Sequence, residues 1–285
     1  MATHRKLRIA TALCTAVLAG AGPAGWAAAA SPAGPAQPAF APAAVAASAT
    51  VGLADLAPSP SPDPFAGLTA DRIADRAVAA TQSATSLRMT GRVVTEGQPL
   101  DVDFAVNDHK ECTGKLRIGG GGAELRQVDG VTYMKGDEKF WRTSMTSQGL
   151  PEPQIDATIE LIQGRWLKIT PGQAGSGELG GVCDLKALLA DLDKDEADRR
   201  GMTRGPDAEV AGTPVATLVK KRPTGETTTV SVSQVGKPHI LKIVKTGGEE
   251  PGTMVLSAYD KPVKVVVPPE DETVDLTKLD PGTSV

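Results

Sequence analysis

The sequence contains few aromatic residues and few histidines, and it lacks the motifs that many enzymes display. Aromatic residues make up 3% of its 285 residues, and three histidines are present. Neither a G-x-S-x-G nucleophile motif nor an H-E-x-x-H zinc motif occurs, and no cysteine lies beside a plausible catalytic base. Carboxylates are numerous, yet nothing singles out two of them as the acid and base of a glycosidase. We therefore predict a protein that is not an enzyme and needs no metal or cofactor.

An excess of positive charge is also missing. The chain carries 30 Lys and Arg against 34 Asp and Glu, which gives a net charge of −4 and a pI near 5.5. A protein that binds nucleic acid needs a basic surface to neutralise phosphates, so we predict no nucleic-acid partner. After residue 30, no apolar run approaches the roughly 18 residues that a membrane span requires. The sequence therefore predicts no transmembrane segment once the N-terminal segment is removed.

The N-terminal segment has the layout of a secretory signal peptide. A basic region with Arg5 and Arg8 precedes the apolar stretch Ile9–Leu18, and small residues with A-x-A cleavage choices follow up to residue 30. A retained membrane anchor is the alternative, but Gly and Pro residues between positions 20 and 25 interrupt the apolar run. We predict that residues 1–30 are a signal peptide and that the mature protein is secreted, extracytoplasmic and associated with the cell envelope.

Cysteine usage agrees with export. Cys14 lies within the predicted signal peptide, which leaves Cys112 and Cys183. An even pair in an exported chain favours a disulfide over two free thiols. A metal or redox pair is the alternative, but neither cysteine belongs to a C-x-x-C motif, and the one histidine nearby, His109, completes no ligand set. Lipidation of Cys14 is not predicted, because Leu13 stands where bacterial lipoprotein signals have a small residue.

Residues 31–68 form a separate segment rich in Ala and Pro, in which only Asp55 and Asp63 are charged. Such a segment cannot bury enough apolar surface to offset its ordering entropy, so we predict a disordered stalk. The prolines between positions 58 and 64 favour extended polyproline geometry. A proline motif that binds a partner is the alternative. Residues 69–285 contain no linker and are predicted to form one domain.

Period-two alternation of apolar residues dominates the predicted domain. Thr69 is a good N-cap for an amphipathic helix that extends to about Ser83, and further helices are predicted around Ile155–Ile162 and Leu185–Leu192. Strands and helices do not alternate, so we predict an α+β fold: a large curved antiparallel sheet of about 11 strands, a half-barrel, with two or three helices over its concave face. The candidate segments for these strands are Leu87–Val93, Leu100–Val106, Lys115–Ile118, Glu124–Val128, Val131–Lys135, Phe140–Arg142, Arg165–Thr170, Ala208–Ala211, Val215–Lys220, Thr227–Gln234, His239–Thr246, Thr253–Tyr259 and Val263–Val267.

Some C-terminal strands, such as Ile240–Val244 and Val263–Val267, are apolar on both faces. A sheet of this kind needs a covering on each side, or it shelters a ligand on one of them. Complete covering by helices and loops is one interpretation. The other is an apolar cavity on the concave face, which would suit an acyl chain. The candidate lining is Leu87, Met89, Val102, Phe104, Tyr133, Trp141, Ile159, Ile162, Leu188, Leu192, Ile243 and Leu256.

The order of these segments resembles a known family. The pattern consists of Ser86–Gly91, Gln127–Lys135 followed by Phe140 and Trp141, Gly212–Val215, Gly236–Leu241 and Tyr259–Val265. Over roughly residues 69–280, the chain resembles the LppX/LprAFG-type cell-envelope lipoproteins, whose half-barrel is similar to the LolA lipoprotein-carrier fold. The resemblance implies a curved sheet with helices over its concave side and, in some members, a cavity that carries lipids or lipoglycans. It implies no catalytic residues, and this chain departs from the pattern in lacking a convincing lipobox.

Two functional hypotheses follow. The first is a secreted, non-catalytic envelope protein that binds or carries an acyl lipid or lipoglycan in a half-barrel cavity. The second is an extracytoplasmic sensor or interaction module that uses the same fold to bind an envelope protein partner. Acyl lipid that co-purifies with the protein favours the first, and a stable partner on an empty protein favours the second. A resemblance of fold alone does not decide between them.

Overall fold

The computed structural model describes the folded part of the chain in four ranges: 63–95, 97–172, 181–194 and 199–275. The predicted signal peptide and almost all of the predicted stalk lie outside the described residues. Phe65 is only 2% exposed and belongs to the hydrophobic core. The core therefore begins a few residues before Thr69, inside the segment that the sequence assigns to the stalk. Within the described ranges, no helix has both the length and the apolar character needed to cross a bilayer.

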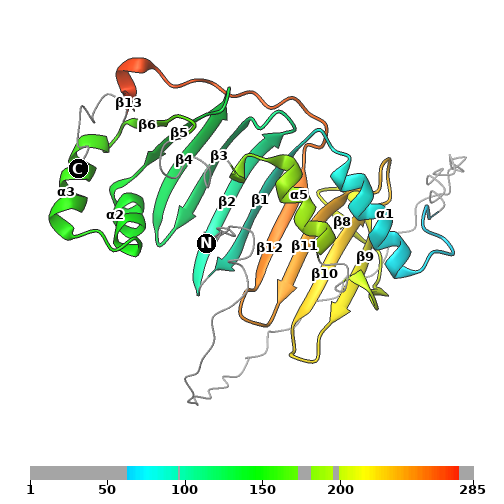
Figure 1. Cartoon of the computed structure of the whole chain (residues 1–285). Helices are drawn as coiled ribbons and strands as arrows, with labels where there is room; N and C mark the ends of the chain where they lie inside the picture. The colour runs from blue at the N-terminus through cyan, green and yellow to red at the C-terminus, as the bar shows by residue number, and fades with distance from the viewer. Residues whose placement is uncertain (1–62, 96, 173–180, 195–198, 276–285) are drawn as a thin grey trace, which may run out of the picture. The chain divides into compact units, whose positions relative to one another are not determined.

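The core of the fold is one open sheet of thirteen strands, which confirms the predicted α+β class (Figure 1). Its strands are β1 (Ser86–Thr95), β2 (Gln98–Asn107), β3 (Cys112–Ile118), β4 (Gly121–Val128), β5 (Val131–Gly136), β6 (Trp166–Ile169), β7 (Thr203–Arg204), β8 (Ala208–Val210), β9 (Thr213–Lys221), β10 (Thr227–Ser233), β11 (Ile240–Thr246), β12 (Gly252–Ser257) and β13 (Thr273–Asp275). Their order is β13-β6-β5-β4-β3-β2-β1-β12-β11-β10-β9-β7, with β8 beside β9. All pairs are antiparallel except β13 with β6.

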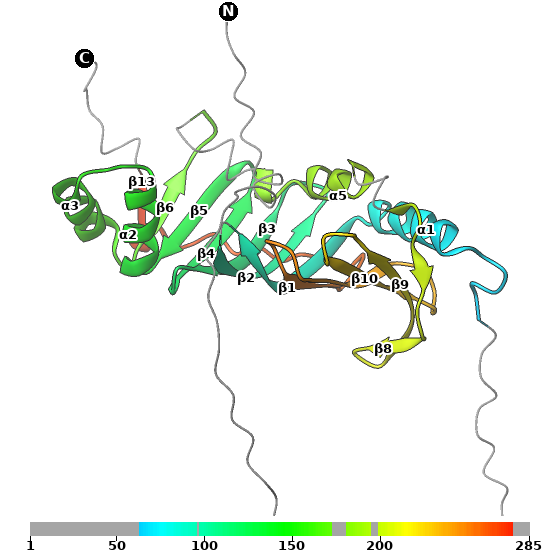
Figure 2. The same ribbon diagram turned by 90° about the horizontal axis from the view of Figure 1, so that it is seen from below.

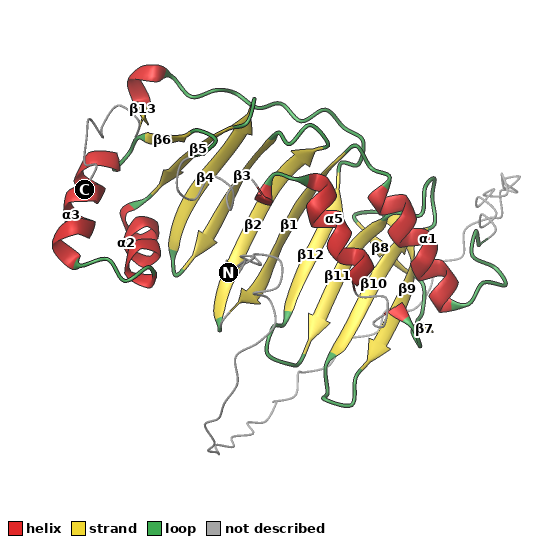
Figure 3. Ribbon diagram, viewed as in Figure 1, coloured by secondary structure: helices red, strands yellow, loops and turns green. Residues whose placement is uncertain are grey.

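Helices cover one face of this sheet (Figures 1 and 2). Helices α1 (Ala70–Gln82) and α5 (Leu185–Lys194) lie over the half formed by β12 to β9, and they contact each other. Helix α2 (Glu138–Ser147) packs against β4 and β5 at the other end, with α3 (Glu152–Ile162) beside it (Figure 3). A short 3₁₀ helix, η1 (Glu270–Glu272), precedes β13. We call the face covered by α1 and α5 the core face and the opposite face the outer face.

Strand register separates apolar and charged side chains between these two faces. Leu87 pairs with Val106 and Met89 with Phe104 across β1 and β2, and these residues lie on the core face. The residues between them point to the outer face, where Arg88 donates to Asp103 at 2.7 Å. Because the side-chain period of a strand is two, a shift of the pairing by one residue would move every side chain of that strand to the opposite face. The alternation seen in the sequence therefore fixes the register.

Glycines on the core face allow neighbouring strands to approach closely. A Cβ atom on Gly91 of β1 would lie 2.1 Å from the carbonyl oxygen of Thr253, and one on Gly114 of β3 would lie 2.4 Å from that of Asp103. Both glycines share the core face with Met89 and Phe104 by register. Glycines at such positions permit the sharp coiling of a curved sheet. The concave curvature thus has a local cause in the sequence.

The predicted disulfide between Cys112 and Cys183 is present and fully buried. Cys112 opens β3, and Cys183 precedes α5 by two residues, with 5.3 Å between the two Cα atoms. The Oδ1 atom of Asp184 then accepts a hydrogen bond from Ala187 N at 3.0 Å in the first turn of the helix. The disulfide therefore attaches the start of α5 to the middle of the sheet.

Two predicted strands are wrong. Phe140–Arg142 lies in α2, because Asp137 acts as an N-cap whose Oδ1 accepts from Phe140 N at 2.7 Å. Its Oδ2 accepts from Gly122 N at 2.7 Å, so the same carboxylate also ties the helix to β4. Val263–Val267 pairs with no strand; it is an extended strap whose Val266 carbonyl accepts from Arg126. The strands β7 and β13, which have two and three residues, were not predicted.

Candidate apolar cavity with a cationic rim

A cavity of about 220 Å³ lies on the core face between α1, α5 and strands β9 to β11. An apolar cavity of about 150 Å³ is large enough to bind benzene, so this space accommodates a small or slender guest. It is smaller than the roughly 300 Å³ at which pockets for drug-sized ligands begin. Its lining consists of Ala74, Ala77, Val78, Leu192, Arg199, Met202, Leu218, Lys220, Arg222, Thr228, Val230, Ile240, Ile243 and Lys245.

The floor of the cavity is a continuous apolar row across three strands. Leu218 of β9 pairs with Val230 of β10, which pairs with Ile243 of β11. The opposite wall is α1, whose Ala74 and Ala77 face the cavity with single methyl groups. The space exists because these alanines are too small to fill the gap between the helix and the sheet. Sequence periodicity alone cannot measure such a gap.

Positive charges form the rim of the cavity. Lys220 of β9 and Lys245 of β11 both pair with Thr228 of β10, so the three residues form the next row on the same face as the apolar floor. Arg199 and Arg222 complete the cationic lining. Within the part of the chain that the structure describes, the residues that line the cavity include these four cations and no carboxylate. We call these four residues the cationic rim.

Asp75 and Glu226 lie close to the cationic rim, and both pair with arginines. Asp75 of α1 lies 3.6 Å from Arg199 Nε and 3.3 Å from Arg200 Nη1, and Glu226 lies 3.3 Å from Arg222 Nε. Lys220 Nζ donates to the main-chain carbonyl of Arg200. The nearby carboxylates thus offset the arginines of the rim, whereas Lys220 contacts a main-chain oxygen.

A compact polar cluster holds the C-terminal end of α1 against β11. Thr81 of α1 accepts a hydrogen bond from Ile240 N at 3.0 Å, and the Tyr259 hydroxyl donates to the Ile240 carbonyl. His239 stacks on the Tyr259 ring with centroids 4.0 Å apart. Burial raises the pKa of Tyr259, so this phenol remains a donor at neutral pH. Since Ile240 also lines the cavity, the cluster fixes one wall of it.

Protonation of His239 is expected to loosen this wall. Burial lowers the pKa of His239 below its usual value of 6.5, with Asp260 acting in the opposite direction. Because the pKa is lower in the folded state, the stabilising contribution of neutral His239 is present above pH 6.5 and is lost as the pH falls below it. The free energy of unfolding should therefore decrease as the pH falls below about 6.5, as measured by urea titration.

The variant His239→Phe keeps a ring against Tyr259 and removes the titrating imidazole. The decrease in the free energy of unfolding at low pH should therefore become smaller. His109→Asn is the matched control, because the side chain of His109 is 80% exposed. An unchanged pH dependence in His239→Phe would contradict this role.

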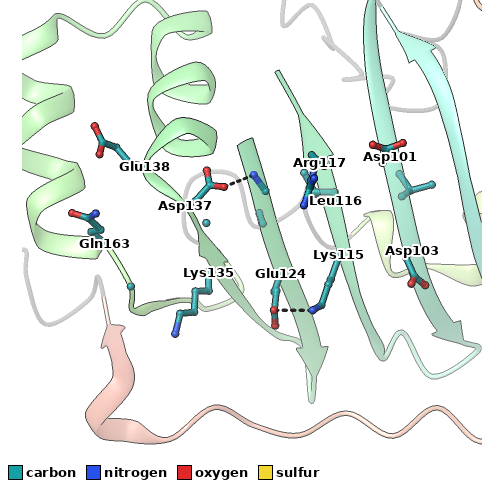
Figure 4. A pocket seen from close by; sticks show the side chains of 15 residues that line it. Asp101, Asp103, Lys115, Leu116, Arg117, Glu124, Lys135, Asp137, Glu138 and Gln163 are labelled. Carbon is teal, nitrogen blue, oxygen red and sulfur yellow. Dashed lines mark hydrogen bonds and ion pairs between the residues drawn. The ribbon is translucent and has the colours of Figure 1, made fainter. Parts of the chain in front are cut away.

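The outer face carries a second, larger hollow of about 710 Å³, bordered by strands β2 to β5 and the start of α2 (Figure 4). Its side chains are mostly charged and mostly paired. Arg92 lies 2.5 Å from Asp101, and Lys115 lies 3.2 Å from Glu124. Hydrogen bonding from Arg92 lowers the pKa of Asp101, so this carboxylate stays ionised. Because these charges already neutralise one another, the hollow on the outer face has little net electrostatic attraction for a charged ligand.

The structure distributes the residues predicted to line a cavity over several places. Leu192 and Ile243 line the cavity under α1 and α5. Tyr133 lies on the outer face by register, opposite Arg126 and Lys168. The others are buried in the hydrophobic core or packed against it: Leu87, Met89, Val102, Phe104, Trp141, Ile159, Ile162, Leu188 and Leu256. Val102 also borders the hollow on the outer face.

Sequence reasoning missed the lysines of the cationic rim. Lys220 follows Leu218 by two residues and Lys245 follows Ile243 by two, so each lysine occupies a core-face position. A charged residue at an apolar position of a strand is a usable signal. It could have been noticed, but the pairing of β9, β10 and β11 was needed to show that the two lysines share one row.

Neither a family model nor a curated protein matches the sequence. Among solved structures, LprF from Mycobacterium bovis is similar, with a TM-score of 0.48 and 13% identity over 70% of this chain and 96% of that chain. LppX from Mycobacterium tuberculosis gives a TM-score of 0.40 and 14% identity over 69% of this chain and 97% of that one. MucB from Pseudomonas aeruginosa, in a complex with MucA, gives 0.31 and 13% over 71% and 59%. LprF and LppX bear names of the family that the sequence resembles, and at these identities the similarity concerns the fold alone.

Proposed function

We propose that this protein is an exported, non-catalytic protein that binds the acyl chain of a small amphiphile in the cavity under α1 and α5. The observation that carries the proposal is an apolar floor of Leu218, Val230 and Ile243 beneath a helix that contributes two alanines and one valine. Each methylene group that leaves water for this space contributes about 0.8 kcal/mol. The buried disulfide supports an oxidising compartment outside the cytoplasm.

Binding of a protein partner is the second candidate function, and the hollow on the outer face is the observation that favours it. Its charged side chains suit a polar partner. However, Arg92 and Lys115 already have carboxylate partners on the sheet, and a partner would have to displace them. The apolar cavity needs no such exchange, so the acyl-chain proposal is better supported.

Partly filling the cavity is expected to weaken this binding without harming the fold. In Ala74→Leu, three added carbon atoms would occupy the space next to Leu218. Displacing two or three methylene groups of the ligand should weaken binding by about 2 kcal/mol, roughly thirtyfold. Calorimetric titration with decanol and with decanoate, below their aggregation limits, measures this loss.

Ala79→Leu provides a matched control, because Ala79 is exposed on the same helix and the substitution is chemically identical. This variant should bind both ligands as the unmodified protein does. Thermal unfolding of both variants checks that the fold is kept. If neither ligand binds to the unmodified protein, or if Ala74→Leu binds as tightly as Ala79→Leu, the acyl-chain proposal is overturned.

A further inference from the structure

We propose that the amphiphile bound in this cavity carries an anionic headgroup, a carboxylate or a phosphate, held by Lys220 and Lys245. The inference rests on the proposed function, since it concerns the polar end of the same ligand. The charge of the cavity lining differs in sign from that of the whole chain. The whole chain is acidic, with a net charge of −4, whereas the described residues that line this cavity comprise four cations and no carboxylate.

The two lysines are placed to bind one headgroup together. They lie on the core face in a single cross-strand row, with Thr228 of β10 between them. Strands in a sheet are about 4.8 Å apart, so the two Cα atoms are separated by about 10 Å, a distance that two lysine side chains readily bridge. Thr228 adds a hydroxyl donor between them. This arrangement provides donors on both sides of one small anion.

The row directly adjoins the apolar floor. Lys220 is two residues from Leu218 along β9, and Lys245 is two residues from Ile243 along β11. A chain that lies on the floor can therefore place its polar end at the lysine row without bending. This continuity of apolar and cationic surface fits a single-chain amphiphile better than a free anion or a neutral hydrocarbon.

The surroundings also favour an anion. Partly burying an ammonium group is unfavourable unless an opposite charge or hydrogen bonds compensate it. The carboxylates beside the rim, Asp75 and Glu226, pair with arginines. Lys220 donates one hydrogen bond to the Arg200 carbonyl, and an ammonium group has three donors, so it can hold this contact and an anion together. An anionic headgroup would supply the compensating charge.

Ligands with one chain length and different headgroups test this assignment. We expect decanoate and decyl phosphate to bind the full-length exported protein about tenfold more tightly than decanol, and decyltrimethylammonium to bind more weakly still. Acetate and inorganic phosphate, which lack the chain, should not bind measurably at the same concentrations. Tight binding of these free ions would show a simple anion site and would overturn the proposal.

The double variant Lys220→Gln/Lys245→Gln should lose the preference for decanoate over decanol while its affinity for decanol changes less than about twofold. Lys242→Gln is the control: Lys242 lies on β11, as Lys245 does, but its register with Val255 places it on the outer face. In the unmodified protein, raising the salt concentration from about 0.05 M to about 0.5 M should weaken binding of decanoate and leave that of decanol unchanged. This measurement needs no variant to fold.

The outcomes separate the two proposals. If no ligand with a decyl chain binds, the acyl-chain function fails. If decanol binds as tightly as decanoate in the unmodified protein, or if the double variant keeps the preference, the acyl-chain function stands and the anionic headgroup is overturned.

Discussion

Replacing Cys112 and Cys183 by alanine is expected to lower the free energy of unfolding by about 4 kcal/mol. The two residues are 71 positions apart, so the disulfide removes much conformational freedom from the unfolded chain. It also ties α5 to β3, and α5 carries Leu192 of the cavity wall. Urea titration of the double variant measures the loss of stability, and decanoate titration measures the effect on the cavity.

Reduction of the unmodified protein in denaturant, followed by refolding with the thiols kept reduced, should give the same loss, because it removes the same constraint without changing any side chain. Agreement between the two measurements would exclude a packing effect of alanine at these fully buried positions. A loss below about 1 kcal/mol in both would mean that the disulfide contributes little to the stability of this fold.

Gly91→Ala is expected to cost about 3 kcal/mol, the upper part of the usual range for overpacking. Gly91 lies in β1 at its contact with β12, where the chain segment from β1 to β6 meets the segment from β9 to β12. A Cβ atom there would lie 2.1 Å from the Thr253 carbonyl oxygen and 2.9 Å from the Met254 Cα atom. Both atoms are main chain, so the two strands must separate to make room.

Gly181→Ala is the matched control for this substitution. A Cβ atom at Gly181 would meet nothing within 4 Å, and its backbone is not in the left-handed region. Its stability should be unchanged or slightly higher, because alanine restricts the unfolded chain. Equal stabilities of the two variants, measured by thermal or urea unfolding, would show that close approach of β1 and β12 is not required.

The strand pattern was predictable because it depends on local alternation. Leu87, Met89, Phe104 and Val106 alternate with polar residues, and the structure places them together on the core face. The helix cap at Thr69 was likewise readable, and its hydroxyl accepts from Arg72 N at 3.3 Å. The prediction failed at Phe140–Arg142, because Asp137 caps a helix there with one carboxylate oxygen. Its other oxygen accepts from Gly122 of β4, a contact between two elements that local alternation does not show.

The candidate site was less predictable than the fold. An apolar cavity was expected from strands with two apolar faces, but ten of the twelve residues proposed for its lining lie elsewhere: nine in the core or packed against it, and Tyr133 on the outer face. An apolar side chain that packs in a core and one that lines a cavity have the same sequence pattern. The difference depends on the gap between α1 and the sheet, which Ala74 and Ala77 leave open.

The sequence by itself determined the alternation of apolar and polar residues, and with it the large sheet, the helices α1, α3 and α5, and the pairing of the last two cysteines. These features depend on residue type and near neighbours along the chain. Only the tertiary structure decided that Lys220 and Lys245 share one row above an apolar floor. The physical reason is that the two lysines are distant in the sequence. Pairing of β9, β10 and β11 in the folded chain brings their ammonium groups to one site.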